Sequence, residues 1–142
     1  MMGSVDRRLA AILVADMEQY SRLMHEDERG TVLSWQNTRE EVIKPTLASH
    51  SGNIIKNTGD GFIAEFATVS GAVECAVEMQ ALLVERNSDR PEGRHLKFRM
   101  GINLGEITVD EDDFYGDGVN VAARLEGLAE APGICISSHV YD

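Results

Sequence analysis

A tight chain reversal lies between two apolar runs at residues 54–66, Ile-Ile-Lys-Asn-Thr-Gly-Asp-Gly-Phe-Ile-Ala-Glu-Phe. The Thr-Gly-Asp-Gly stretch at 58–61 supplies residues that favour turn conformations, and apolar residues flank it on both sides. The pattern therefore predicts a β-hairpin. It places Asp60 at the tip of the turn and Lys56 four residues earlier, on the entering strand.

A second aspartate, Asp16, ends another apolar run, Leu9-Ala-Ala-Ile-Leu-Val-Ala, which reads as a buried strand. Magnesium is usually held by one or two carboxylates together with substrate phosphates. Asp16 and Asp60 could be such a pair if their strands are neighbours. The alternative is structural: Asp16 would cap the next helix, and Asp60 would only shape its turn.

The segment after Asp16 reads as a helix over residues 17–26. A helix that starts there would point backbone N–H groups at whatever binds near the carboxylate, and such groups favour phosphate. Metal and helix start together suit a triphosphate. Lys56 would share a strand face with Asp60 at even spacing, although the turn weakens this inference. Taken alone, Lys56 fits a solvated strand lysine better.

Asn120 and Arg124 are four residues apart in a segment that reads as a helix, so they share one face. An amide beside a guanidinium can orient and neutralise a phosphoryl group. The plainer alternative is an exposed Asn and Arg near a helix start.

The composition excludes several classes of protein. A chain of 142 residues that is 43% hydrophobic fits one globular domain, 1–142. No run approaches the ~20 apolar residues of a membrane helix, and the N-terminus lacks the apolar stretch of a signal peptide, so we expect no membrane insertion and a cytoplasmic location. A net charge of −11 argues against a nucleic-acid partner but leaves a metal-bound nucleotide possible. Cys75 and Cys135 read as small core residues.

Hydrophobic periodicity predicts a mixed order of elements. Strands are expected at 9–15, in the 54–66 hairpin, at 96–102 with 105–109 returning as its hairpin partner, and at 133–137. Helices are expected at 17–26, 30–49 (with Pro45 near its end or at a kink), 68–87 and 119–128. This order predicts an α+β sheet with helices mainly on one face.

Four motifs in this order resemble the class III nucleotidyl (adenylate/guanylate) cyclase catalytic domains, particularly bacterial adenylate cyclases. They are the segments 12–24, 56–62, 98–105 and 115–125. The resemblance runs from about residue 8 to the end. It implies the class III cyclase fold, a ferredoxin-like βαββαβ sheet, in which the usual C-terminal hairpin is missing from this chain. The expected organisation is a single catalytic domain that lacks its last C-terminal elements.

The resemblance assigns metal and base roles. Asp16 and Asp60 match the aspartates that hold two Mg²⁺ or Mn²⁺ ions, and the Met17 carbonyl matches a further metal ligand. Lys56 and Asp113 match the pair that reads the purine. The lysine can donate to adenine N1 and the carboxylate can accept from the 6-amino group, so the pair favours adenine.

The resemblance also implies the reaction, the partners and the remaining roles. Asn120 matches the residue that positions the ribose, and Arg124 the one that stabilises charge in the transition state. The implied reaction is ATP to 3′,5′-cyclic AMP and pyrophosphate, in cyclic nucleotide signalling. Family sites form at a dimer interface, so a head-to-tail homodimer with two shared sites is expected.

One departure concerns Gln19, where the family often has glycine; a helical backbone there would tolerate glutamine. The alternative function is a catalytically silent nucleotide-binding or dimerisation module. The complete set of six side chains favours the enzyme, whereas the absent C-terminal segment favours the silent module.

Overall fold

The computed structural model describes residues 6–110 and 113–137, with the backbone alone at 6, 109–110 and 113–115. Its centre is a sheet in which six described strands take the order β2-β3-β1-β4-β5, while β6 pairs with β4. The pairs are antiparallel except for β4 with β6, which is parallel. The strands are β1 (Asp6–Met17), β2 (Asn53–Asn57), β3 (Gly61–Phe66), β4 (Phe98–Asp110), β5 (Asp113–Tyr115) and β6 (Ile134–Ile136).

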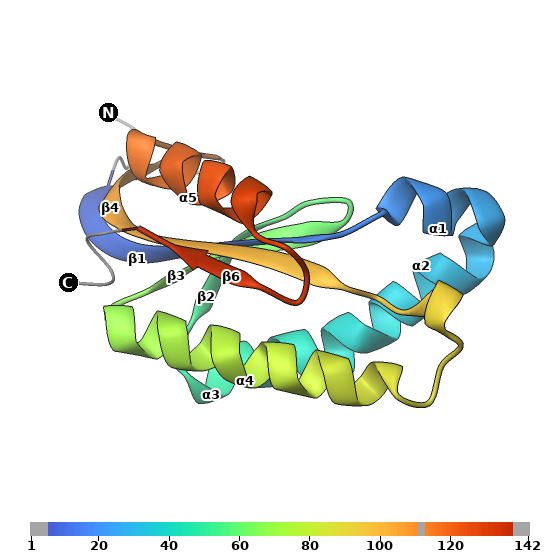
Figure 1. Ribbon diagram of the computed structural model, residues 1–142. Coiled ribbons are helices and arrows are strands. Elements are labelled where there is room, and N and C mark those ends of the chain that lie inside the picture. Colours follow the sequence, from blue (N-terminus) through green and yellow to red (C-terminus); the bar gives the residue numbers. More distant parts are fainter. Residues whose placement is uncertain (1–5, 111–112, 138–142) are drawn as a thin grey trace.

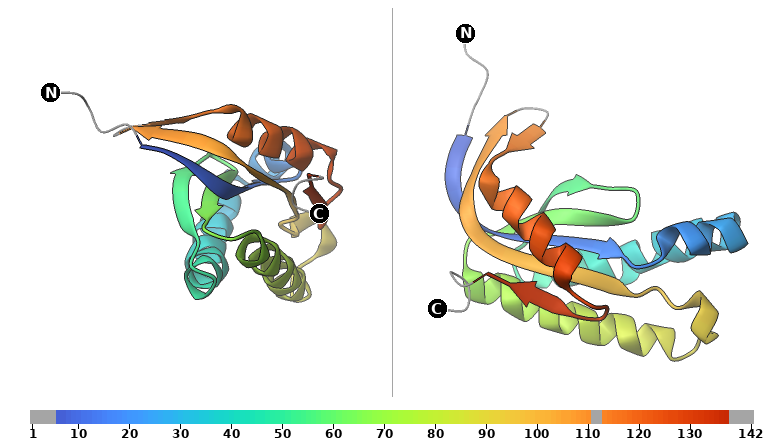
Figure 2. Two further views of the ribbon diagram at one scale, coloured as in Figure 1. Left: turned by 90° about the vertical axis from the view of Figure 1, so that its left-hand side faces the viewer. Right: turned by 45° about the horizontal axis from the view of Figure 1, so that its top comes forward.

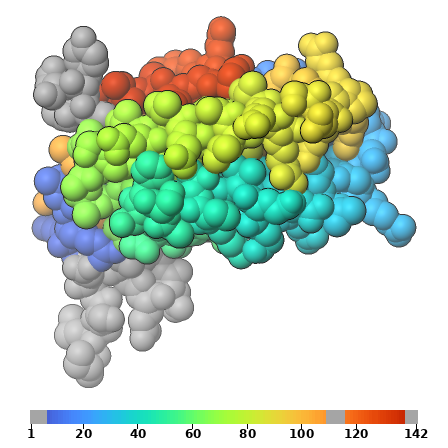
Figure 3. Space-filling model, turned by 90° about the horizontal axis from the view of Figure 1, so that it is seen from below, coloured from blue at the N-terminus to red at the C-terminus, as the bar shows by residue number. Residues whose placement is uncertain are grey.

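Helices lie on both faces of this sheet, but mainly on one (Figure 1). Helices α2 (Glu28–Thr38), α3 (Lys44–Ser49) and α4 (Val69–Asn87) lie below the sheet in that view, and α5 (Asp117–Leu128) lies above it. Helix α1 (Tyr20–Glu26) follows the end of β1, and a short 3₁₀ turn (Glu92–Arg94) precedes β4. From below, α4 and the α2–α3 region cover the sheet (Figure 3). The predicted α+β class with helices mainly on one face is confirmed.

Strand β1 is the centre of the molecule because strands pair with both of its edges. It pairs with β4 along its whole length, from Asp6 opposite Val109 to Met17 opposite Phe98. Its odd-numbered side chains from Ala11 to Met17 join the large core below the sheet, and its even-numbered ones from Ala10 to Val14 join a smaller core beneath α5. Alternation by two continues to Asp16, which therefore lies on the α5 face.

The prediction that 105–109 returns as the hairpin partner of 96–102 is wrong. Residues 98–110 form one continuous strand, which curves strongly beside β1 (Figure 2), and β5 is the partner that returns. Gly101 and Gly105 lie within this strand, on the face covered by α5. A methyl group at Gly101 would come within 2.4 Å of the Ala122 carbonyl oxygen, and one at Gly105 within 2.9 Å of the Gly118 Cα. Both glycines let α5 lie directly on the strand.

The predicted helix over 30–49 is present but is not uniform. Helix α2 continues through a π-helical turn (Arg39–Ile43) into α3. Pro45 lies at the start of α3, where its missing N–H costs little. No helix in the described part of the chain is long and apolar enough to cross a membrane. Cys75 is fully buried, as predicted, and burial raises the pKa of its thiol to about 12.

Candidate active site

Asp16 and Asp60 are brought together at one end of β1, as the sequence suggested. Asp16 pairs in register with Gly61, the residue after Asp60, and the Met17 amide donates to the Asp60 carbonyl oxygen at 2.8 Å. A methyl group at Gly61 would lie 1.9 Å from the Ala15 carbonyl oxygen, so only glycine permits this approach. The indole N–H of Trp35 also holds the turn by donating to the Gly59 carbonyl at 3.2 Å.

The two carboxylates are close enough to influence each other electrostatically. Partial burial raises the pKa of Asp60, and the negative charge of Asp16 raises it further. Two neighbouring, partly buried carboxylates favour a cation between or beside them. This is the electrostatic property that a divalent metal site requires.

Arg99 is the cation that the chain itself supplies. It lies opposite Asp16 in the β1–β4 ladder and donates to both carboxylate oxygens, with Nε to Oδ1 at 3.1 Å and Nη2 to Oδ2 at 3.2 Å. Arg99 Nε also lies 3.4 Å from Glu126 Oε2, which belongs to α5. Arg99 therefore contacts both Asp16, on β1, and Glu126, on α5.

Glu126 is the unexpected member of this group. Its side chain is only 6% exposed. Burial raises the pKa of Glu126 to about 8, and its hydrogen bond to Asp16 and the charge of Asp16 act in the same direction. A buried carboxyl group held largely protonated at neutral pH can donate a hydrogen bond to Asp16 as well as face Arg99.

The turn after Asp16 differs from the expected one. Gln19 adopts the left-handed backbone conformation, with φ 58° and ψ 32°, and precedes α1 without a side-chain cap. The expectation that a helical backbone would accommodate glutamine is therefore wrong; this position favours glycine sterically. A cavity of about 590 Å³ lies beside the turn and is lined by Glu18, Gln19, Arg99 and residues 129–131.

Asn120 and Arg124 are both exposed and lie one turn apart on α5, as predicted. Val119, Ala122 and Glu126 are the buried side chains of the same helix, so Asn120 and Arg124 lie outside its sheet-facing stripe. No hydrogen bond or ion pair joins either residue to Asp16 or Asp60 among the described residues. The structure therefore brings the two aspartates together and leaves Asn120 and Arg124 exposed on α5, with no hydrogen bond or ion pair to either aspartate among the described residues.

Lys56 and Asp113 lie on the two outermost strands of the path β2-β3-β1-β4-β5. Lys56 is exposed on β2, next to a register shift between Ile54 and Lys56. The side chain of Asp113 lies outside the described part of the chain, so the base-reading pair stays a prediction.

Comparison with known proteins gives a family for this arrangement. The model of the adenylate and guanylate cyclase catalytic domain matches residues 6–142. The chain belongs to this family.

Relatives and solved structures agree with the cyclase assignment. The chain is 46% identical over 139 residues to "Putative adenylate cyclase 3" of Rhizobium meliloti (strain 1021). The aligned region covers 98% of the chain and 24% of that relative. It is similar to an adenylate/guanylate cyclase/hydrolase from Silicibacter pomeroyi, with 43% identity, a TM-score of 0.89, and coverage of 97% of the chain and 80% of the other. The guanylyl cyclase Cya2 is 28% identical, with a TM-score of 0.84 and coverage of 98% and 79%. The chain thus spans about a quarter of the length of the Rhizobium relative.

Two residues of this cyclase domain could not be selected from the sequence. Arg99 alternates with core residues of β4, and its sequence separation of 83 residues hides its pairing with Asp16. Glu126 lies near the end of α5, between Leu125 and Gly127, where a glutamate usually faces solvent. The available signal was Gly101: a glycine in the middle of a strand indicates close approach of another backbone, here that of α5 at Glu126.

The cyclase domain has the donor set for a metal that is shared with a substrate. The described residues contain no group of three or more His, Cys, Asp or Glu side chains placed to hold an ion alone. Two partly buried aspartates with raised local negative potential fit the usual magnesium arrangement of one or two carboxylates completed by phosphate oxygens and water.

Proposed function

We propose that this domain is an adenylate cyclase that converts ATP to 3′,5′-cyclic AMP and pyrophosphate at a homodimer interface. The observation that carries the proposal is the meeting of Asp16 and Asp60 beside Arg99, while Asn120 and Arg124 are exposed on α5 without a hydrogen bond or ion pair to either aspartate among the described residues. One chain therefore supplies two partial sites, and a head-to-tail dimer would complete both.

In this proposal Asp16, Asp60 and the Met17 carbonyl would hold two Mg²⁺ or Mn²⁺ ions. When bound, such ions lower the pKa of the ribose 3′-hydroxyl and neutralise charge on the transferring phosphoryl group. The chain's own residues bind and orient the nucleotide. Arg99, which lines the cavity beside Asp16, would contact the phosphates of the nucleotide.

Asn120 and Arg124 would act on the substrate held by the partner's aspartates. The Asn120 amide would orient the ribose, and the Arg124 guanidinium would stabilise charge on the phosphoryl oxygens. Both need to be exposed before assembly, and both are. Ile55 and Ile63 are only partly buried against the small core on the same sheet face, which leaves apolar surface for a second copy.

The choice of ATP over GTP rests on Lys56 and Asp113. An ammonium group can donate to adenine N1, and a carboxylate can accept from the 6-amino group, whereas guanine presents the opposite pattern at these positions. The adenylate cyclase name of the Rhizobium relative supports the same choice.

The first test measures cyclic AMP release from ATP with Mn²⁺ by purified protein, for wild type and for Asp16→Ala and Asp60→Ala. Loss of a metal ligand should lower turnover on the order of 10³-fold, because metal contributes several kcal/mol to the transition state. Asp89→Ala, in an exposed loop, is the matched control and should leave turnover unchanged. Wild-type turnover in Asp60→Ala would contradict the metal role. ATP binding without any turnover by wild type would instead support the silent module.

The second test mixes two inactive chains, Asp60→Ala and Arg124→Ala. If sites are shared, each heterodimer contains one intact site, so activity should return to a measurable fraction of wild type. Arg29→Ala, an exposed arginine of α2, replaces Arg124→Ala in a control and should be active alone. Heterodimers that form but remain inactive would refute the shared geometry.

A further inference from the structure

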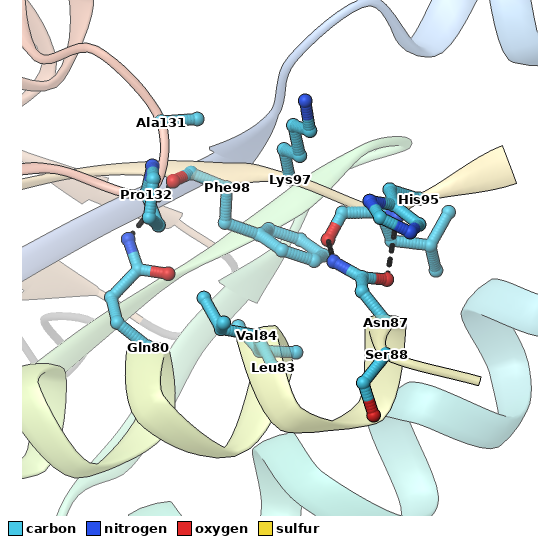
Figure 4. A pocket seen from close by; sticks show the side chains of 11 residues that line it. Gln80, Leu83, Val84, Asn87, Ser88, His95, Lys97, Phe98, Ala131 and Pro132 are labelled. Carbon is cyan, nitrogen blue, oxygen red and sulfur yellow. Dashed lines mark hydrogen bonds between the residues drawn. The ribbon is translucent and has the colours of Figure 1, made fainter. Parts of the chain in front are cut away.

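A second cavity, of about 400 Å³, lies between α4 and the start of β4 (Figure 4), and neither Asn120 nor Arg124 lines it. It is enclosed by the C-terminal half of α4, the start of β4 and the loop at 131–132. Apolar groups form most of its wall, chiefly Leu83, Val84, Leu96, Phe98 and Pro132. Its volume lies within the range of small-molecule sites, which are mostly apolar with a few placed polar groups.

Apart from Lys97, which extends away from the cavity, the polar side chains that line it are paired, with one exception. Asn87 makes two hydrogen bonds with the Leu96 backbone, donating to its carbonyl at 2.9 Å and accepting from its amide at 3.0 Å. The His95 ring pairs with the Arg90 carbonyl at 3.0 Å, and the Ser88 hydroxyl donates to the Glu85 carbonyl. These groups have their partners without a ligand.

Gln80 is the exception. Its amide nitrogen donates to the carbonyls of Phe98, at 2.9 Å, and Gly133, at 3.2 Å, which fixes the orientation of the amide. Its Oε1 is then left buried with no hydrogen-bond partner among the described residues, and the side chain is only 6% exposed. Figure 4 shows this oxygen on the side of the cavity occupied by Phe98 and Val84. A buried acceptor without a donor is costly, so the site is suited to a ligand that brings one.

We propose that this cavity binds an uncharged, mostly apolar small molecule whose single hydrogen-bond donor, a hydroxyl or N–H, pairs with Gln80 Oε1. A charged ligand is disfavoured because no side chain of opposite charge points into the apolar wall; Lys97 extends away from it in Figure 4. The proposal concerns binding alone and does not depend on the cyclase reaction.

The position of the cavity connects it physically to the aspartates. Phe98, its floor, lies opposite Met17 in the β1–β4 ladder, and its ring is 5.3 Å from that of Trp35, which holds the Gly59 carbonyl. The Lys97 carbonyl accepts from the Glu18 amide at 2.7 Å. Ala131 lines both this cavity and the one beside Arg99. A bound molecule would contact Phe98, and a single residue, Met17 or Trp35, lies between Phe98 and the turn that carries Asp60.

The experiment uses octan-1-ol and its isomer 1-methoxyheptane, an ether with the same atoms but no hydrogen-bond donor. Isothermal titration calorimetry measures binding to the folded protein without metal or nucleotide, and the emission of Trp35, the only tryptophan of the chain, reports occupancy. Octan-1-ol should bind saturably, one per chain, and change the Trp35 emission. The ether should bind about fivefold more weakly or worse, because it leaves Gln80 Oε1 unpaired.

Two variants of α4 locate the site. Val84→Phe places a ring at the cavity wall and should weaken octan-1-ol binding on the order of tenfold, equivalent to 1.4 kcal/mol. Val77→Phe is the matched control: Val77 is similarly exposed on the same helix but does not line the cavity, so binding should match wild type. The absence of saturable binding, equal affinity for alcohol and ether, or wild-type affinity in Val84→Phe would each overturn the proposal. Because no turnover is measured, failure here is distinct from failure of the cyclase reaction.

Discussion

The sheet face below β1 is filled largely by aromatic and other large side chains, whereas the hydrophobic core beneath α5 consists of aliphatic side chains alone. The lower core contains Trp35, Phe62, Phe66, Met79 and Phe98 and is covered by α2, α3 and α4. The upper core contains two alanines, two valines and two isoleucines, and α5 reaches the sheet only because glycines permit backbone contact. The lower face buries large side chains, whereas on the upper face the backbones of α5 and β4 lie in close contact.

From this difference we expect the lower face to provide most of the stability and the upper face to carry the proposed chemistry. Buried aromatic area supplies hydrophobic free energy, so the lower face should carry most of the stability. The upper face holds Asp16, Arg99, Glu126, Asn120 and Arg124, and its remaining apolar surface is only partly covered. Substitutions on the two faces should therefore fail in different ways.

The largest effect is expected from Phe98→Ala, which would break the lower face. Removing a fully buried ring that packs on Trp35 should lower the free energy of unfolding by about 3 to 5 kcal/mol. Urea denaturation measures this value, with the emission of Trp35 as the signal. A loss below 1 kcal/mol would show that the lower face is not the main source of stability.

Gly101→Ala would break the upper face. The added methyl would lie 2.3 Å from the Glu126 amide nitrogen, so α5 must shift, at a cost of about 1 to 3 kcal/mol. Turnover should fall further than stability suggests, because the shift moves Glu126 and Arg124 together. Gly127→Ala is the matched control on α5. No atom lies near its position, and alanine there should stabilise the helix by up to about 1 kcal/mol.

Glu126→Gln would test the upper face through the pH dependence of the free energy of unfolding. The folded chain holds the Glu126 proton up to about pH 8, whereas the unfolded chain loses it near the ordinary glutamate value of 4.5. Between these values the folded state binds more protons, so this group makes the wild type less stable as pH rises. The variant lacks the contribution, and its stability relative to wild type should increase by about 1 to 4 kcal/mol from pH 5 to pH 8.

Thermal or urea unfolding in the presence of a chelator, across that pH range, measures the Glu126 effect. Glu85→Gln, an exposed position on α4, serves as the control and should follow the wild-type profile. A pH profile for Glu126→Gln that is parallel to the wild type would show that Glu126 is ionised in the folded protein at all of these pH values.

The smallest effect is expected from Gln19→Gly, at the turn after Asp16. Glycine removes the cost of a left-handed residue, about 1 kcal/mol, but adds flexibility to the unfolded chain. It also removes the hydrogen bond that Arg22 donates to Gln19 Oε1 at 2.9 Å. The net gain in unfolding free energy should be about 0.5 kcal/mol, measured by urea denaturation. A loss of 1 kcal/mol or more would show that the Gln19 side chain stabilises the turn.

The sequence predicted local features of this fold well and close contacts between distant segments poorly. The apolar run before Asp16 and the Thr-Gly-Asp-Gly turn are local signals, and both elements are present. The prediction of a hairpin within residues 96–109 is wrong because β4 is one curved strand, and only the position of α5 shows why glycine is needed at 101 and 105. The same applies to the site: carboxylates at strand ends were visible in the sequence, but the Arg99 partner of Asp16 depends on strand register.

The central position of β1 has a consequence for how the chain is made. Strand β1 precedes every other described element in the sequence, yet one of its edges pairs with β4, which ends only at Asp110. After β3 ends at Phe66, a ribosome working at 5–20 residues per second needs about 2 to 9 s to finish β4. During that time an apolar strand has one unpaired edge. During synthesis this part of the chain should therefore depend on chaperone binding.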